Sequence, residues 1–342
     1  MNLSKSNKPI LICLGGGISQ IPLIRAAQKN YQLIIIDKDK KCLGKKLAKI
    51  FLNISTSNDY EIIKKLNKLN IDKKLIKGVI NRSSGEAILT MSKIQKKFLL
   101  NGSNPKMVKK TLNKNDFVIH CKKNNILVPK VFNNKRIKNH ISIIDFPIIV
   151  KPSLSRVGKK GISIVNDKRD LQKGINLAKK YSDNNSLIIQ EKIEGKDIVL
   201  LGAVKNNKFL DLTTIDEINL INNNIIGRFS YRNPSKNINL KIKNKIIKIA
   251  NKIIKIFKLN NCPLNLSFRL GKKNKIYLIE INLEISGELI HEKLIKTKDK
   301  NFNSFSWYLD ILFSNDQKLK SNTFLNKSIK INDKILRVQN VN

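Results

Sequence analysis

The sequence predicts an α/β protein, with an open parallel sheet at the N-terminus and a larger α+β part after it. Over about the first hundred residues, short apolar runs alternate with helical patterns in a β-α-β-α-β order, which is typical of a parallel sheet. Farther along, several strand-like runs follow one another with single helices between them, as in α+β proteins. The chain has 342 residues and 41% hydrophobic content, enough for two or three domains with substantial cores.

The N-terminal sheet is expected from three apolar runs, each followed by a helical pattern. The strands are residues 9–14, 32–37 and 77–81, and the helices are residues 20–29, 60–69 and 86–100. The first strand runs into Gly15–Gly17 and the second ends in Asp37, which hints at NAD binding. Because the third glycine of G-x-G-x-x-G is missing, the turn indicates only backbone N–H groups that can bind a carboxylate or phosphate.

The second part is expected to contain more strands than helices. Strands are predicted at residues 145–152, 162–165, 186–191, 198–204, 208–212 and 225–231, and helices at residues 109–123 and 170–181. A longer helix at residues 242–257 places Ile246, Ala250 and Ile253 on one face, a spacing that marks a helix packed on a core. Residues 264–270 and 275–281 are predicted to form a hairpin.

The net charge of +42 is compatible with binding to polyanions, and a basic nucleic-acid-binding protein is one alternative. Arg, which reads bases and phosphates in a bidentate manner, supplies nine of the 67 basic residues, and the Lys residues are spread along the whole chain. We therefore expect non-specific attraction to polyanions and no specific nucleic-acid partner.

Cysteine and histidine spacing predicts no metal motif. Cys13, Cys42, Cys121 and Cys262 are far apart, and the three His residues show no zinc-ligand spacing. The sequence also contains no apolar run long enough for a membrane span and no signal-peptide pattern. These features predict a cytoplasmic protein with reduced cysteines and no membrane partner.

The stretch Tyr277–Gly287 carries the strongest chemical signal. Glu280 and Asn282 lie two residues apart in a predicted strand, so their side chains point to the same face. A carboxylate and an amide oxygen side by side suit Mg²⁺, a hard cation that also keeps waters and phosphate oxygens. The alternative is a half-buried strand with two polar residues facing solvent.

Several motifs, in order, resemble the ATP-grasp superfamily, in the branch that includes carbamoyl-phosphate synthetase and the purine carboxylases. They begin with Ile10–Gly17 followed by Gln20, Ile36-Asp37 and the turn Asn81–Gly85, and the resemblance covers about residues 8–315. It implies a Rossmann-like pre-ATP-grasp domain at residues 1–104 and an ATP-grasp domain at residues 105–317. A small lid subdomain would span about residues 146–193, and residues 318–342 would form a polar C-terminal appendage with short strands.

The resemblance implies two lysines and a loop as ligands of the ATP phosphates. Lys114 matches the family's first basic ligand, and Lys151 the second. Lys151 ends an apolar strand, where an unpaired ammonium group would be costly. The loop at residues 153–161 resembles the phosphate-covering loop of the lid, with Ser155, Gly158 and Gly161 as ligands. Solvated lysines and an ordinary hairpin loop are the alternatives.

The segment after the strand at residues 186–191 resembles the family's hinge, which holds the adenosine. Backbone groups of Glu191 to Ile193 would bind the adenine edge, with Gln190 in place of the usual Glu beside them. Asp197 stands where an acid accepts hydrogen bonds from the ribose hydroxyls. The alternative is a strand running into a polar turn.

The family's metal set is an acid or Gln on one strand and Glu-x-Asn on the next. Here Glu280 and Asn282 match, whereas the first position falls on Ser267, a weaker oxygen ligand. Relatives continue with Asn-Pro-Arg, but this chain has Glu284 at the Arg position. Arg269 and Arg228 are therefore candidates for the missing catalytic cation. Glu284 and Glu288 favour a substrate that bears an amine instead.

The reaction implied by the resemblance is an ATP- and Mg²⁺-dependent ligation, with Mn²⁺ as the other metal considered. A small-molecule carboxylate would be activated as an acylphosphate and attacked by an amine, a thiol or a similar nucleophile. A homodimer is one assembly that this branch suggests. Because Ser267 and Glu284 depart from the pattern, the alternative is an ATP-binding relative without ligase activity, in a binding or regulatory role.

Overall fold

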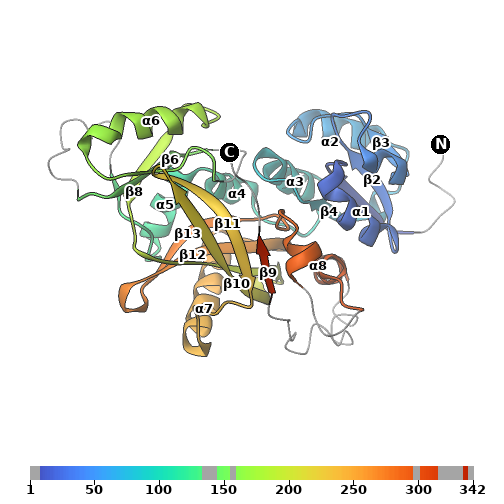
Figure 1. Ribbon diagram of the computed structural model, residues 1–342. Helices are drawn as coiled ribbons and strands as arrows, with labels where there is room; N and C mark the ends of the chain where they lie inside the picture. The colour runs from blue at the N-terminus through green and yellow to red at the C-terminus, as the bar shows by residue number, and fades with distance from the viewer. Residues whose placement is uncertain (1–7, 133–144, 155–158, 296–300, 315–333, 338–342) are drawn as a thin grey trace.

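The computed structural model describes residues 8–132, 145–154, 159–295, 301–314 and 334–337 of the chain (Figure 1). Within them, two sheets account for all the strands: a four-stranded sheet and a ten-stranded sheet. The mixed α/β fold class is therefore confirmed.

The N-terminal sheet is parallel throughout, as its β-α-β order predicted. Its strands run in the order β3-β2-β1-β4. They are β1 (Ile10–Leu14), β2 (Gln32–Ile36), β3 (Ile50–Leu52) and β4 (Ile76–Asn81), with helices α1 (Ile21–Gln28), α2 (Asp59–Lys68) and α3 (Glu86–Lys97). The sequence did not indicate β3, because three residues are too few to show a periodicity.

The large sheet is antiparallel and supplies the floor of the second part. Its main strands are β9 (Gly195–Lys205), β10 (Lys208–Asn222), β11 (Ile225–Asn233), β12 (Cys262–Gly271) and β13 (Ile276–Asn282), with β14 (Lys334–Arg337) beside β11. β10 continues well past its predicted end at residue 212, because the following residues pair with β11. Their mixed polar and apolar sequence hid this extension.

A smaller group of strands continues the large sheet and has a core of its own. It contains β5 (Val131–Phe132), β6 (Ile148–Pro152), β7 (Ser163–Val165) and β8 (Leu187–Glu191), covered by α6 (Leu171–Lys180). Ile148, Val150 and Leu171 belong to this separate core. β7 meets β11 through the pair Ser163–Ile225. In Figure 1 this group and the N-terminal sheet stand at opposite ends of the large sheet.

The predicted helix at residues 109–123 is two helices, α4 (Pro105–Leu112) and α5 (Lys114–Lys123). The break falls at Asn113, whose side chain accepts hydrogen bonds from the N–H groups of Asn115 and Asp116 and so caps α5. The cap places Lys114 at the first position of α5. The local structure therefore differs from the prediction at a residue that matters for the site.

Alternation along β12 gives the large sheet one apolar and one polar face. Leu264, Leu266 and Phe268 join the core that contains α7 (Leu240–Ile256). Asn265 and Ser267, between them in sequence, point to the opposite face. Figure 1 shows α7 on the side of the sheet away from α6 and the N-terminal sheet, so the polar face lies toward those two parts.

The helix α8 (Ser304–Phe313) packs against the N-terminal part, although it follows β13 of the large sheet in sequence. The Phe313 ring occupies space that a Cβ on Gly78 of β4 would fill, and its centroid lies 6.3 Å from that of Tyr31. Seven of its ten residues are buried, so it lacks the one-sided apolar spacing that would have predicted it.

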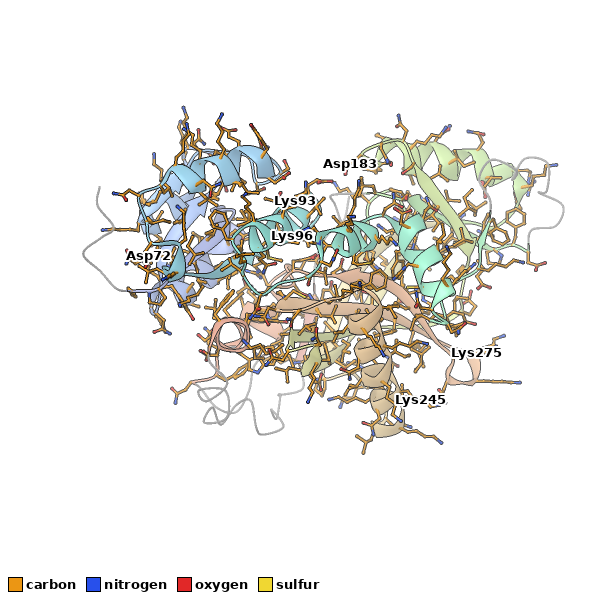
Figure 2. All side chains as sticks on the ribbon, turned by 180° about the vertical axis from the view of Figure 1, so that it is seen from behind. Asp72, Lys93, Lys96, Asp183, Lys245 and Lys275 are labelled. Carbon is orange, nitrogen blue, oxygen red and sulfur yellow. The ribbon has the colours of Figure 1, made fainter. Side chains whose placement is uncertain are left out.

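Basic side chains are spread over separate parts of the surface, as their distribution in the sequence predicted. Figure 2 shows Lys93 and Lys96 on α3, far from Lys245 on α7 and from Lys275 before β13. In the part of the chain that the structure describes, no helix is both long and apolar enough to cross a membrane.

Candidate active site

A cleft lies on the polar face of the large sheet, where three parts of the chain meet. Its cavity has a volume of about 270 Å³. β9, β10, β12 and β13 form its floor, Leu154 and Lys159 reach it from the loop after β6, and Ser84 and Gly85 reach it from the N-terminal part. Of the side chains singled out from the sequence, those lining the cavity are Lys114, Asp197, Ser267, Glu280, Asn282, Glu284 and Glu288.

Hydrogen bonds around Ser153 hold the start of α5 against the end of β6. Ser153 is fully buried, its carbonyl accepts a hydrogen bond from the Lys114 N–H at 3.0 Å, and its hydroxyl donates to Asn113 Oδ1 at 3.1 Å. Asn115 Nδ2 donates to Ser153 Oγ at 3.0 Å. Because Lys151 lies two residues before Ser153, this network sets Lys114 and Lys151 side by side. Sequence reasoning missed Ser153, although its place directly after the Lys151-Pro152 pair was a signal.

Lys114 and Lys151 surround the carboxylate of Glu280. Lys114 Nζ lies 3.4 Å from Glu280 Oε1. The Lys151 side chain is buried, and burial together with the repulsion of Lys114 lowers the pKa of Lys151 to about 7, against the attraction of Glu280. Burial acts to raise the pKa of Glu280, but Lys114, Lys151 and Lys159 hold it below its usual value. The cluster therefore places an ionised carboxylate among lysines. The carboxylate suits a metal cation, and the lysines suit an anionic ligand bound beside it.

Glu280, Asn282 and Ser267 form an oxygen-only donor set on two paired strands. Ser267 of β12 lies directly opposite Glu280 of β13, and Asn265 lies opposite Asn282. The Glu280 side chain keeps 39% of its surface exposed to the cleft. Among the described residues no three His, Cys, Asp or Glu side chains form a metal cluster. These donors fit Mg²⁺, which takes one or two carboxylates and completes its shell with water and phosphate oxygens.

The predicted hinge is built largely of backbone hydrogen bonds. The Glu191 N–H donates to Lys130 O at 2.9 Å, and the Lys130 N–H donates to Glu191 Oε1 at 2.6 Å. In the described ranges, no residue forms a hydrogen bond with the Ile193 N–H or with the Lys192 carbonyl. Gln190 is buried in β8, and these hinge residues lie outside the lining of the cavity.

Asp197 and Arg269, predicted to bind ribose and to act as a catalytic cation, bind each other. Arg269 Nε lies 2.7 Å from Asp197 Oδ1, and Nη2 lies 2.5 Å from Oδ2. Asn219 Nδ2 also donates to Asp197 Oδ2 at 2.6 Å, and Arg269 Nη1 donates to Ile193 O at 2.9 Å. The Asp197 carboxylate thus already accepts three hydrogen bonds, and the Arg269 guanidinium connects β12 to the hinge.

The loop after β6 reaches across the cleft through Lys159. Its Nζ lies 2.5 Å from Glu217 Oε1 on β10. Gly161 has φ +75°, a left-handed conformation that favours glycine. Ser155 and Gly158 lie outside the described residues, as does the side chain of Arg228, whose backbone lies in β11. Sequence reasoning missed Glu217, because only the register of β9, β10 and β11 brings it to the cleft.

Glu284 and Asn265 form a polar wall of the cleft beside the metal-type strand pair. Burial, with the repulsion of Glu280, raises the pKa of Glu284 to about 8. Asn265 Nδ2 donates to Glu284 O at 2.6 Å and to Ser286 Oγ at 3.0 Å. Tyr231 Oη donates to Glu288 Oε2 at 2.7 Å. Asn265 was not singled out from the sequence, although its place two residues before Ser267 puts it on the same face.

Arg82 of the N-terminal part holds this wall in place. Its Nη1 and Nη2 lie 2.6 Å and 2.9 Å from the carboxylate oxygens of Glu292, and Nη2 also donates to Ser286 O at 3.1 Å. The guanidinium stacks over the Phe305 ring, 4.9 Å from its centroid. Since Arg82 is buried, the predicted turn Asn81–Gly85 is a structural joint between the N-terminal part and the cleft.

Comparisons with known proteins point to one superfamily. The family model described as an ATP-grasp domain matches residues 144–292. A formate-dependent phosphoribosylglycinamide formyltransferase from Prochlorococcus marinus subsp. pastoris is 28% identical over 179 residues, which are 51% of this chain and 44% of that protein. The match thus spans less than half the length of this curated relative.

Solved structures share the fold over most of this chain. A phosphoribosylglycinamide synthetase from Anaerococcus prevotii superposes with a TM-score of 0.67 at 23% identity, covering 90% of this chain and 75% of the other. The ADP complex of an N5-carboxyaminoimidazole synthetase from Staphylococcus aureus gives a TM-score of 0.70 at 17% identity, covering 92% and 80%. At these identities the likeness concerns the fold alone.

Proposed function

The chain belongs to the ATP-grasp superfamily, and we propose that it is an ATP- and Mg²⁺-dependent ligase that joins a small-molecule carboxylate to an amine or a similar nucleophile. One observation carries the proposal: Lys114 Nζ lies 3.4 Å from the Glu280 carboxylate, whose pKa is also lowered by Lys151 of β6 and by Lys159 of the loop after it. Such a cluster can share the charge of a transferred phosphoryl group.

In the proposed reaction, a carboxylate oxygen of the substrate attacks the γ-phosphorus of ATP, and the bond to the bridging oxygen of ADP breaks. The nitrogen of the second substrate then attacks the carbon of the acylphosphate. The bond from that carbon to the phosphate oxygen breaks, and the nitrogen loses a proton. Because the protein supplies no covalent nucleophile, catalysis consists of positioning and charge neutralisation.

The residues divide this work by position. Lys114, Lys151 and the loop that ends at Gly161 bind the phosphates, together with Ser155 and Gly158 in the same loop. Glu280, Asn282 and Ser267 would hold Mg²⁺, which neutralises phosphate oxygens when bound.

The adenosine end would be held by the hinge and by Asp197. The Lys192 carbonyl and the Ile193 N–H present an acceptor and a donor next to each other, which is the pattern that an adenine edge requires. Glu191 and Gln190 would hold these hinge groups in place through β8 and the contact with Lys130. Asp197 would accept hydrogen bonds from ribose with the lone pairs that Arg269 and Asn219 leave to it.

The proposal has further parts that concern the whole protein. We place the protein in the cytoplasm, with small-molecule substrates as its partners and a homodimer as the assembly to be examined. Residues 1–104 and 105–317 would act as the two main domains, with a lid at about residues 146–193 and an appendage at residues 318–342. Closing of this lid would exclude water from the acylphosphate.

The test is release of ADP from MgATP with the twenty L-amino acids and common carboxylic acids as substrates. We expect turnover with a particular carboxylate and nucleophile, and its loss by two orders of magnitude or so in Lys151→Met, as for removal of a group that stabilises transition-state charge. Lys245→Met on α7 is the matched control and should keep full activity. ADP binding without turnover over the whole panel would favour instead a nucleotide-binding protein without ligase activity.

A further inference from the structure

A groove separate from the cleft lies where the C-terminal ends of α3 and α7 meet the start of α4. Its larger part has a volume of about 870 Å³. A smaller part continues it along α3, and the two parts share Lys96, Asn104 and Pro105. None of the described residues that line this groove also lines the cavity of the cleft. We call it the basic groove, because its lining contains six lysines: Lys93, Lys96, Lys97, Lys106, Lys255 and Lys258.

Most lysines of the basic groove have no acidic partner. Among the described residues, no Asp or Glu lines the groove. Lys93 pairs with Asp59 at 2.9 Å, whereas no described residue forms an ion pair with the other five lysines, which are exposed. Outside the described ranges the sequence contains three acidic residues, Asp299, Asp316 and Asp333, which are fewer than the lysines of the groove. The groove therefore has an excess of positive charge that an acidic partner would neutralise.

Hydrogen bonds join the two walls of the basic groove. The Asn104 N–H donates to Lys258 O at 3.2 Å. Ser103 Oγ donates to Asn260 O at 3.1 Å, and the Asn260 N–H donates to Ser103 Oγ at 3.0 Å. These bonds connect segments that lie far apart in the sequence. The groove is thus formed before a partner binds, which lowers the entropy cost of binding.

Leu99, directly after α3, exposes an apolar side chain in this groove. It is 94% exposed, the largest value for a large apolar residue in the described ranges. Its φ of +54° lies in the left-handed region, which Gly and Asn adopt at lower cost. Leu at this position is therefore unfavourable for two reasons: it strains the backbone, and it exposes apolar surface to water. An apolar group of a partner that packs on Leu99 would remove the second cost.

We propose that the basic groove is a docking surface for an acidic segment of another protein, one that carries an apolar side chain among its carboxylates. The lysines would pair with the carboxylates, and Leu99 would contact the apolar side chain. A nucleic acid fits less well. The described lining contains no Arg, which binds phosphate in a bidentate manner, and no aromatic ring, on which bases stack.

The experiment measures binding of three fluorescent probes to the full chain by anisotropy, at an ionic strength of about 0.15 M. The probes are a peptide of Glu and Leu, an oligoglutamate with the same number of carboxylates, and an oligouridylate with the same number of phosphates. Leu99→Asn removes the apolar side chain and suits the left-handed backbone. Lys96→Glu/Lys255→Glu reverses charges in the groove. Lys245→Glu/Lys275→Glu, well away from Lys96 in Figure 2, is the matched control with the same net charge.

We expect the Glu/Leu peptide to bind about tenfold more tightly than either other probe. Leu99→Asn should weaken that peptide about fivefold and leave oligoglutamate unchanged. Its melting temperature should equal or exceed that of the wild type. Lys96→Glu/Lys255→Glu should weaken the peptide about tenfold or more, and the control pair should weaken it far less. All variants should bind MgADP as the wild type does, because none of these residues lines the cleft.

The docking surface is excluded if the Glu/Leu peptide does not bind, or if Leu99→Asn binds it as tightly as the wild type does. Equal losses in the groove pair and in the control pair would reduce the binding to the general charge of the chain. Oligouridylate that binds as tightly as the peptide, and loses affinity in Lys96→Glu/Lys255→Glu, would make the groove a nucleic-acid site instead. Each of these results can be obtained whether or not the protein is a ligase.

Discussion

Arg269 of β12 and Asp197 of β9 bind each other through both carboxylate oxygens, with N–O distances of 2.7 Å and 2.5 Å. The two residues are direct register partners in the β9–β12 ladder. Because Arg269 also donates to the carbonyl of Ile193, the pair ties the hinge to the large sheet. Arg269 therefore positions the hinge. A contact with phosphate would have to use guanidinium N–H groups that bind neither Asp197 nor the Ile193 carbonyl.

Removing this pair should lower stability. We expect Arg269→Ala to cost about 1–3 kcal/mol, because Asp197 would keep only the Asn219 amide as a partner. The midpoint of urea unfolding measures the change. Arg169→Ala is the control, since Arg169 pairs with Asp167 on the open surface, where solvent screening leaves such a pair little effect on stability. Equal effects of the two variants would contradict the structural role of Arg269.

The pKa of Lys151 gives nucleotide binding a pH dependence of known sign. Burial and the repulsion of Lys114 lower the pKa of Lys151 to about 7, so above pH 7 the unliganded protein holds it mostly neutral. Phosphate oxygens favour the charged form and raise the pKa of Lys151. Binding at pH 8 should therefore take up a proton, by an amount approaching one, and uptake should vanish as the pH falls below about 6.

Calorimetry of a non-hydrolysable ATP analogue with Mg²⁺, in buffers of different ionisation enthalpy, measures this uptake. Lys151→Met should remove it at pH 8. Lys245→Met, exposed on α7, should leave it unchanged. Proton uptake that survives in Lys151→Met would show that another group titrates.

Because Lys159 contacts Glu217, the substitutions Lys159→Met and Glu217→Gln should affect the affinity for MgADP differently. When phosphate binds, we expect Lys159 to exchange the Glu217 carboxylate for phosphate oxygens. Lys159→Met should then weaken MgADP about tenfold, roughly the value of one charged hydrogen bond. Glu217→Gln should not weaken it, because the substitution removes a competitor. Equilibrium titration of the two variants with MgADP measures both affinities. A similar loss of affinity in both variants would mean that the Lys159–Glu217 contact persists when MgADP is bound.

Gly195 allows the hinge to approach β12 closely. A Cβ at this position would overlap the carbonyl oxygen of Leu270, a backbone atom that cannot move aside easily. Gly195→Ala should therefore destabilise the protein by about 1–3 kcal/mol, as overpacking does. Gly17→Ala, where a Cβ would meet no atom within 4 Å, is the matched substitution and should be close to neutral. Thermal unfolding compares the two variants. Equal melting temperatures of Gly195→Ala and Gly17→Ala would contradict a close approach of the hinge to β12 at Gly195.

Local periodicity predicted most of the fold and one half of the site. The period of two placed Glu280 and Asn282 on one face, and the structure shows both in the lining of the cleft. The parallel N-terminal sheet followed from its alternating elements. α8 escaped prediction because it is buried on most sides, and the break at Asn113 escaped because a cap does not interrupt an apolar pattern.

The other half of the site depends on contacts between distant residues. Asp197 and Arg269 are register partners across β9 and β12, and Lys159 meets Glu217 from the loop after β6. No local pattern encodes these pairings, since they follow from how the strands assemble. Asn265 was within reach, because the alternation that turns Ser267 toward the cleft also turns Asn265 toward it.

The most direct test of the Mg²⁺–nucleotide cleft is the affinity for ADP with and without Mg²⁺, in the wild type and in Glu280→Gln. We predict that Mg²⁺ tightens ADP binding about tenfold or more in the wild type, and that the variant loses this gain because the amide cannot neutralise the cation. Two results would contradict the account: an ADP affinity of the wild type that does not depend on Mg²⁺, or an increase in ADP affinity with Mg²⁺ that persists in Glu280→Gln.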